Sequence, residues 1–126
     1  MQKTILRNGI KVIHKNSLSD IAVINIAITV GSNHETKKKK GIAHFLEHMV
    51  FEGTTTRTCE EISREIEQYG GEMNAYTCNE KTNFYVKIHK KYAEKAIEIL
   101  ADMLQNSTFK QDVLEKEKNV VIEEIN

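Results

Sequence analysis

The sequence contains no proline, only two cysteines, and no apolar run of the length that a membrane span requires. A membrane helix needs about 20 apolar residues, and a disulfide-stabilised secreted domain needs more cysteines than Cys59 and Cys78. The N-terminus has no apolar secretion signal. We therefore expect two unpaired thiols, no contact with a membrane, and a location in the cytoplasm, with an organelle as the alternative. Without proline, the ends of helices and strands are predicted from glycine and polar residues alone.

The sequence also lacks an excess of charge of either sign. Lys and Arg total 18, Asp and Glu total 18, and the formal net charge is zero. Binding of nucleic acid through bulk charge requires a strong basic excess, so this class of partner is excluded. With 40% hydrophobic and 29% charged residues, the 126-residue chain has the composition of one folded domain rather than of a disordered protein.

The hydrophobic pattern predicts a mixture of strands and helices. Asn8-Gly9 between two short apolar runs predicts a β-hairpin with a two-residue turn. The apolar, β-branched run over 21–30 predicts a central strand buried on both faces. Further strands are expected over 73–77 and 82–89, and helices over 41–52, 58–69, 91–105 and 108–126. In the 82–89 strand, alternation places Phe84, Val86 and Ile88 on one face. In the 91–105 helix, the residues with core spacing are Ala93, Ala96, Ile97, Leu100 and Leu104. The expected fold class is α+β, with helices packed on a largely antiparallel sheet.

The segment His44-Phe45-Leu46-Glu47-His48 contains the residues with catalytic potential. On a helix, His44 and His48 lie about 40° apart around the axis and one turn apart along it, with Glu47 on the same side. Two such imidazoles can bind zinc, and a neighbouring carboxylate can act on a zinc-bound water. His-x-x-Glu-His is a zinc peptidase signature, although the same five letters also fit a solvated amphipathic helix. The opposite side has the spacing of a core face and consists of Ile42, Phe45, Leu46 and Met49.

A catalytic zinc usually has three protein ligands, and the last predicted helix contains candidates for the third. Glu117 and Glu124 lie two turns apart inside an apolar stripe, whereas Glu123 lies outside it. A carboxylate in an apolar stripe is costly unless it is paired or binds a metal. Periodicity therefore favours Glu124 or Glu117 over Glu123. The alternative is that the helix end frays and leaves these carboxylates exposed.

Several separated segments resemble the pitrilysin and insulysin-type zinc metallopeptidases, a family that includes the mitochondrial processing peptidases and bacterial and archaeal relatives. The matching segments occur in the family's order over nearly the whole chain. They are LRNGIKV (6–12), GS with Glu35 (31–35), GIAHFLEHM with Phe51 and Gly53-Thr54 (41–54), GGEMNAYT (70–77) and EKNVVIEE (117–124).

The resemblance implies a role for each acidic residue and histidine of the predicted site. It implies that His44, His48 and Glu124 bind one Zn²⁺ per chain and that Glu47 is the catalytic general base. It implies that Glu117 is a second acidic residue that supports the site. The family's third ligand lies some 75 residues after the second histidine, and Glu124 fits this spacing.

The resemblance also implies a substrate-binding strand. Asn74, Ala75 and Tyr76 would lie on an exposed sheet edge, to which a peptide adds as another strand. Phe51, Asn74 and Tyr76 would help to form a side-chain pocket near the scissile bond. Ordinary core packing is the alternative role for Phe51 and Tyr76.

The expected function is that of a zinc-dependent endopeptidase domain, which hydrolyses peptides through a zinc-bound water activated by Glu47. The alternative is a peptide-binding or assembly module of a peptidase complex, with little activity of its own. The expected partners are a peptide or unfolded protein substrate and a second homologous domain or subunit. Since a working family subunit is several times longer, we expect residues 1–126 to be an incomplete N-terminal catalytic part. Such a part would bind zinc but hydrolyse peptides weakly or not at all.

Overall fold

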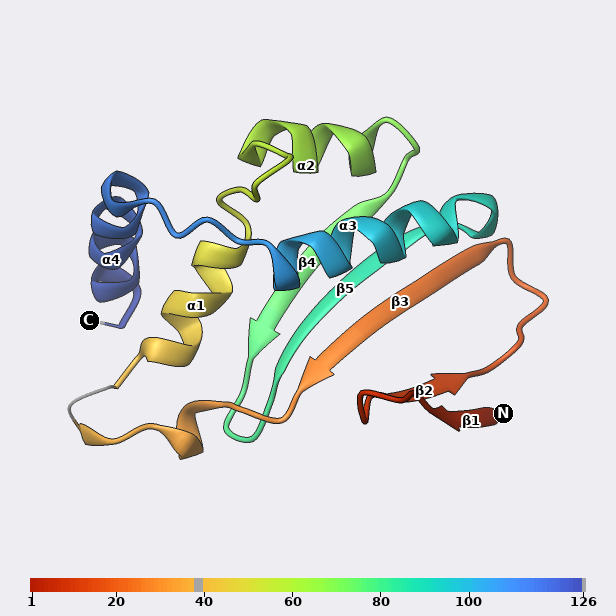
Figure 1. Cartoon of the computed structure of the whole chain (residues 1–126), viewed down its shortest axis with the longest axis horizontal. Coiled ribbons are helices and arrows are strands. Elements are labelled where there is room, and N and C mark those ends of the chain that lie inside the picture. Colours follow the sequence, from red (N-terminus) through yellow and green to blue (C-terminus); the bar gives the residue numbers. More distant parts are fainter. Residues whose placement is uncertain (38–39, 126) are drawn as a thin grey trace.

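The computed structural model describes residues 1–37 and 40–125, without the side chains of 121, 124 and 125. The strands are β1 (Gln2–Ile5), β2 (Lys11–His14), β3 (Ile21–Ile28), β4 (Glu72–Thr77) and β5 (Thr82–His89). The helices are α1 (Ile42–Val50), α2 (Cys59–Glu67), α3 (Ala93–Gln105) and α4 (Gln111–Ile125), with 3₁₀ turns η1 (Ser32–His34) and η3 (Lys90–Tyr92). This order confirms the predicted α+β class (Figure 1).

The main sheet is antiparallel, with the strand order β3-β5-β4. The central strand is β5, and its residues Phe84, Val86 and Ile88 are buried against the helices, as the alternating pattern predicts. The prediction for the 21–30 run is wrong, because β3 lies at one edge of the described sheet. Its exposure alternates, and Val23 is 61% exposed. A run of apolar residues predicts a strand, but it does not determine which strands lie beside it.

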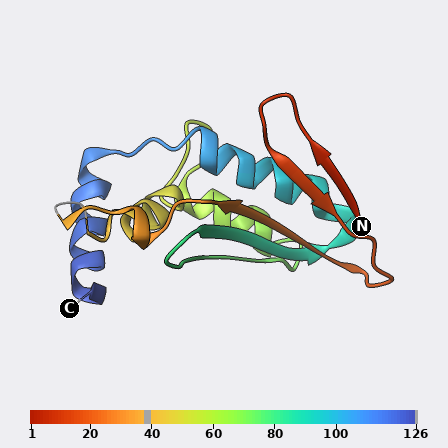
Figure 2. The ribbon, with the colours of Figure 1, turned by 90° about the horizontal axis from the view of Figure 1, so that it is seen from below.

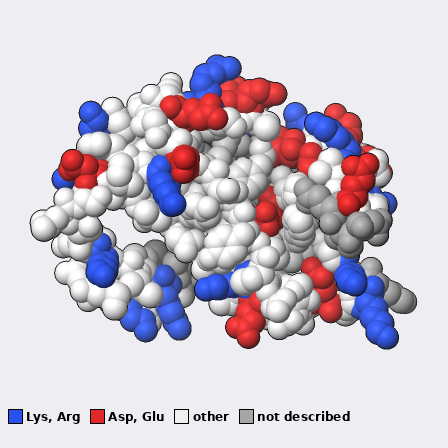
Figure 3. Space-filling view, turned by 180° about the vertical axis from the view of Figure 1, so that it is seen from behind, with Lys and Arg blue, Asp and Glu red and all other residues white. Residues whose placement is uncertain are grey.

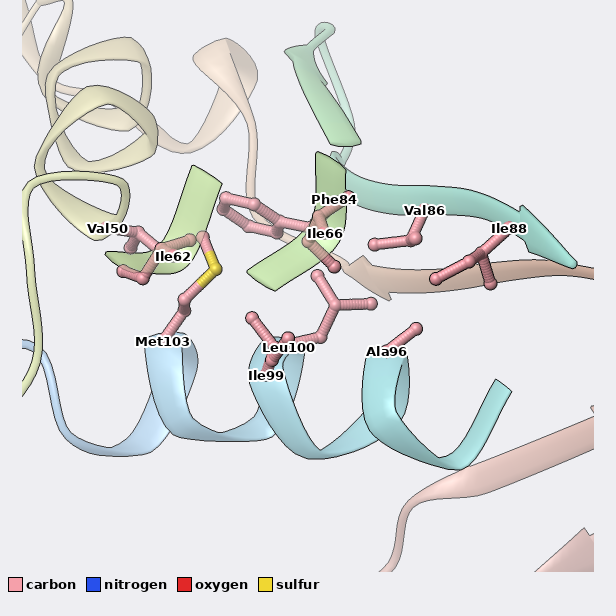
Figure 4. Close-up of a cluster of buried hydrophobic side chains, with 10 residues drawn as sticks. All are labelled: Val50, Ile62, Ile66, Phe84, Val86, Ile88, Ala96, Ile99, Leu100 and Met103. Atoms are coloured by element: carbon pink, nitrogen blue, oxygen red, sulfur yellow. The ribbon is translucent and has the colours of Figure 1, made fainter. Parts of the chain in front are cut away.

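Helices α1, α2 and α3 cover one face of this sheet, as the turned view shows (Figure 2). The core between the two layers consists of apolar side chains from all three helices and from β5 (Figure 4). In α3 the buried apolar residues are Ala96, Ile99, Leu100 and Met103. Ile97, expected in the core, is 51% exposed. The sheet therefore contacts a face of α3 that is rotated slightly from the predicted one.

The N-terminal hairpin forms a separate two-stranded sheet, and its turn is longer than predicted. The amide of Gly9 donates to the carbonyl of Leu6, and the amide of Leu6 donates to the carbonyl of Ile10. Among these turn residues, Gly9 alone has positive φ, at 91°. The turn is therefore a three-residue loop with a left-handed glycine, a common alternative to the two-residue turn.

A buried ion-pair network fixes the loop that follows α1. Asp102 of α3 is 9% exposed and accepts hydrogen bonds from Thr54 at 2.7 Å, Arg57 at 2.8 Å and Asn106 at 2.8 Å. Burial opposes ionisation of Asp102, but these hydrogen bonds outweigh it and lower its pKa. The network therefore connects α3 to the segment directly after α1, the histidine helix, which contains His44 and His48.

The charged side chains do not form a single-sign surface on the open face of the sheet. Viewed from behind, this face has a mostly uncharged centre, with side chains of both signs towards its rim (Figure 3). This distribution agrees with the zero net charge. None of the described helices is long and apolar enough to cross a membrane.

Candidate metal and catalytic site

Helix α1 begins directly after Gly41, whose φ is 88° and which has no side chain to cap the helix. Glu35 supplies the missing acceptors, since its carboxylate accepts from the amides of Gly41 at 2.8 Å and Ala43 at 2.9 Å. The first amides of a helix have no partners within it, and a negative charge there is favourable. Glu35 therefore fixes the first turn of the helix that contains His44.

The two histidines of α1 converge. The Nε2 atoms of His44 and His48 are 3.0 Å apart, and their ring centroids are 4.8 Å apart. Two imidazole nitrogens on a tetrahedral zinc, each at about 2.0–2.1 Å, are separated by about 3.3 Å. The observed pair therefore fits one zinc ion with only a small adjustment.

Glu117 of α4 lies behind the second histidine. It is 7% exposed, and its Oε2 atom is 3.1 Å from Nδ1 of His48. A carboxylate at Nδ1 favours the tautomer in which Nε2 carries the lone pair that can bind a metal. Glu52 lies close by, and burial, followed by the Glu117 carboxylate, raises the pKa of Glu52. The buried position of Glu117 agrees with the apolar stripe in which the sequence places it.

Glu47 is oriented by the end of β4. The hydroxyl of Thr77 donates to Oε2 of Glu47. This contact leaves Oε1 of Glu47 available to a reacting group. It also connects the predicted general base to the strand expected to bind substrate.

The histidines and Glu47 line an open cleft that continues along β4. The cleft has a volume of about 510 Å³, and Phe51, Met73 and Asn74 also line it. These three residues also line a neighbouring pocket of about 440 Å³, which lies between β4 and α2. The two hollows together form a groove beside an edge strand.

Of the four predicted substrate residues, Phe51 and Asn74 line this groove, and Ala75 and Tyr76 follow Asn74 on β4. Strand β4 is at the edge of the described sheet, as the resemblance implies, and Asn74 and Tyr76 are exposed. Tyr76 is therefore not a core aromatic. Ala75 is half-buried, as is Phe51, whose ring centroid lies 6.1 Å from that of Phe84. Phe51 thus lines the cleft and also packs on the core.

The predicted core face of α1 is partly wrong. Ile42 and Leu46 are 41% and 43% exposed, whereas Ala43, Met49 and Val50 are buried. The helix packs against both β4 and α4, so two of its sides are covered instead of one.

The third predicted ligand, Glu124, lies in α4, but its side chain is outside the described part of the structure. Among the described side chains, no group of three potential ligands converges on one point. Lys38 and Lys39 of the basic run over 37–40 also lie outside the described residues. Cys59 and Cys78 are free thiols, as predicted.

Three residues with close contacts to the site were missed from the sequence as functional candidates: Glu35, Glu52 and Thr77. Glu35 lies in a polar loop six residues before Gly41, and nothing local predicts that it returns to cap the helix. Thr77 reaches Glu47 through the packing of β4 on α1. Glu52 has a weak signal, because it follows His48 by four residues on the same helical face.

Comparison with known proteins identifies the family of this chain. Residues 11–126 match the insulinase peptidases, family M16. The chain belongs to this family. The fold of this insulinase-family chain superposes on a protease from Helicobacter pylori with a TM-score of 0.94 and 29% identity, over 98% of this chain and 30% of that one. The predicted resemblance is therefore confirmed.

The relatives of this insulinase-family chain are longer proteins. It is 45% identical to an uncharacterized zinc protease of Rickettsia felis, over 95% of this chain and 29% of that protein. It is 42% identical to the mitochondrial-processing peptidase subunit beta of Rattus norvegicus, over 98% of this chain and 25% of that protein. The chain thus spans less than a third of the length of these relatives.

Proposed function

We propose that this chain is the zinc-binding catalytic part of an endopeptidase, in which Glu47 is the general base. The convergence of two imidazole Nε2 atoms at 3.0 Å, beside a carboxylate on the same helix, is the observation that supports this function. The zinc protease and peptidase names of the relatives agree with it. A solvated amphipathic helix would also bring these two rings together, but it would not place a buried carboxylate, Glu117 at 7% exposed, 3.1 Å from Nδ1 of His48.

His44 and His48 would bind zinc through Nε2, with Glu124 as the third ligand. Position 124 follows Glu117 by seven residues, which is about two turns of α4 and places both on the same side of that helix. Zinc, when bound, polarises the scissile carbonyl and lowers the pKa of the attacking water. Glu117 keeps the proton of His48 on Nδ1, so that Nε2 carries the lone pair that would bind the ion.

Glu47 moves the proton during hydrolysis. Because the Thr77 hydroxyl occupies Oε2, Oε1 is the atom that takes the proton from the attacking water. The protonated carboxyl then passes this proton to the leaving amine. A single carboxylate thus serves first as base and then as acid.

The substrate would bind as an added strand on the free edge of β4. Main-chain hydrogen bonds would hold the peptide beside Glu47 whatever its side chains are. Phe51, Asn74 and Tyr76 would contact the side chains of the peptide. A second homologous domain or subunit would close the cleft from the open side. The length of the relatives, and the name of one of them as a subunit, support this partner.

The test compares the wild-type chain with Glu47→Gln. We expect both to bind one zinc ion and only the wild type to cleave a fluorescence-quenched peptide, slowly and with the chain in excess over peptide. Glu115→Gln, an exposed change on α4, is the matched control and should leave zinc binding and cleavage unchanged. Cleavage by Glu47→Gln at the wild-type rate contradicts the assigned base. A wild-type chain without zinc that still binds peptide favours the alternative of a binding or assembly module.

A further inference from the structure

The 31–35 segment contacts the turn between β4 and β5. The amide of Ser32 donates to the carbonyl of Cys78 at 3.2 Å, and the amide of Asn33 donates to the carbonyl of Asn79 at 2.8 Å. The Ser32 hydroxyl also donates to Oδ1 of Asn79 at 2.9 Å. A Cβ atom at Gly31 would lie 2.2 Å from the Cys78 carbonyl oxygen, so glycine is required for this approach. The segment is therefore closely packed on the residues that directly follow Thr77.

The same segment ends at Glu35, whose two carboxylate oxygens accept from the first amides of α1. Helix α1 has only nine residues, and an isolated helix of this length is unstable in water. His44 is its third residue and Glu47 its sixth. The predicted metal ligand and base thus lie within about two turns of the end that Glu35 caps.

A second contact joins the same two elements directly, because Thr77 of β4 donates to Glu47 of α1. The end of β4 is therefore connected to α1 twice, once through Thr77 and once through the turn, the 31–35 segment and Glu35. Together with the packing of α1 on β4 and α4, these two connections at different points hold the position and the rotation of α1 relative to β4.

We propose that Glu35 is a positioning residue that sets the histidine helix relative to the edge strand β4 and preorganises His44 for zinc. The role in zinc binding rests on the proposed function, whereas the contacts of Glu35 with α1 do not depend on it. A cap that only stabilised the fold would lower the melting temperature without a specific effect on zinc. A positioning residue affects zinc affinity beyond its effect on stability.

The chain offers a matched control in Thr58, the N-cap of α2. Its hydroxyl accepts from the amide of Glu61 at 3.1 Å, and α2 also has nine residues. Thr58→Ala therefore removes a helix cap of similar kind from a helix without predicted ligands. Caps of this type contribute about 1 kcal/mol to stability, so the melting temperature should fall by a similar amount in both variants.

The experiment compares four 126-residue chains: the wild type, Glu35→Ala, Glu35→Gln and Thr58→Ala. For each chain, chelator competition measures the zinc affinity, and thermal unfolding without metal measures the melting temperature. Glu35→Ala should weaken zinc binding about tenfold, because the first turn must then be ordered at the expense of binding free energy. Glu35→Gln keeps one acceptor oxygen and should lose less. Thr58→Ala should stay within about twofold of the wild type. If Glu35→Ala does not fold, Glu35→Gln provides the comparison.

Amide exchange of the metal-free chain gives a readout that is independent of zinc. The amides of Gly41 and Ala43, which donate to Glu35, should exchange about tenfold faster in Glu35→Ala than in the wild type, while those of α2 stay unchanged. Unchanged zinc affinity and exchange in Glu35→Ala, or an equal loss of zinc affinity in Thr58→Ala, would overturn the inference. A wild-type chain that binds no zinc refutes the proposed function instead, and the exchange rates then decide the role of Glu35 alone.

Discussion

Replacing Glu117 by alanine removes the carboxylate that lies 3.1 Å from Nδ1 of His48. Glu117 itself is buried at 7% exposed, so water replaces the lost acceptor poorly. Loss of such a partner typically weakens the metal affinity of the imidazole by about 10- to 100-fold, which corresponds to about 1.4–2.7 kcal/mol. We expect the dissociation constant for zinc to rise by this factor.

Competition with a coloured chelator measures this change on the 126-residue chain. Glu117→Gln keeps an acceptor oxygen but loses the charge, so its zinc affinity should fall between those of the wild type and Glu117→Ala. Glu115→Ala, two residues away and exposed, is the control and should bind zinc as the wild type does. Wild-type affinity in Glu117→Ala would refute the role of the His48 contact in the metal site.

Three further predictions concern stability. Asp102→Ala leaves Arg57 without its buried partner and should lower the free energy of unfolding in urea by about 3–5 kcal/mol. The control is Glu98→Ala, which removes a 60% exposed partner of the same arginine and should change this free energy little. Equal losses in the two variants would argue against a buried network. Because the pKa of Asp102 is lowered in the folded chain, its contribution is present above the ordinary carboxyl pKa and is lost as the pH falls through the folded value. Asp102→Asn should therefore reduce the loss of urea stability between about pH 5 and pH 2, and an unchanged pH profile would contradict this. Gly31→Ala should lower the melting temperature more than Gly70→Ala, since an added Cβ meets a carbonyl oxygen at 2.2 Å only at position 31; equal shifts would show that the 31–35 segment moves freely.

Local sequence patterns predict where helices and strands occur better than they predict which of these elements lie side by side. The alternation of Phe84, Val86 and Ile88 places β5 against the helices, because strand period alone determines which side chains share a face. The position of β3 at the edge of the described sheet depends on strand pairing, which no residue within 21–30 specifies. Likewise, Ile42 and Leu46 have core spacing on α1 but lie partly exposed, because the packing of α1 on β4 and α4 is not specified within the helix itself.

The candidate site likewise contains residues that the sequence predicts and residues whose contacts only the structure reveals. His44, Glu47 and His48 lie within one short helix, so their common side follows from helical geometry. Glu117 is predictable as a buried carboxylate because it interrupts an apolar stripe. Glu35 and Thr77 reach α1 from a loop and from β4, and only the packing of these segments reveals their contacts.

The central claim, that His44 and His48 bind a zinc ion on which Glu47 acts without binding it, is tested most directly by the zinc content of three purified chains. Elemental analysis after dialysis against trace zinc should give one zinc per chain in the wild type and in Glu47→Gln. It should give a marked loss in His48→Ala, whose remaining imidazole cannot bind the ion tightly alone. Full zinc occupancy in His48→Ala, or its loss in Glu47→Gln, would contradict the account.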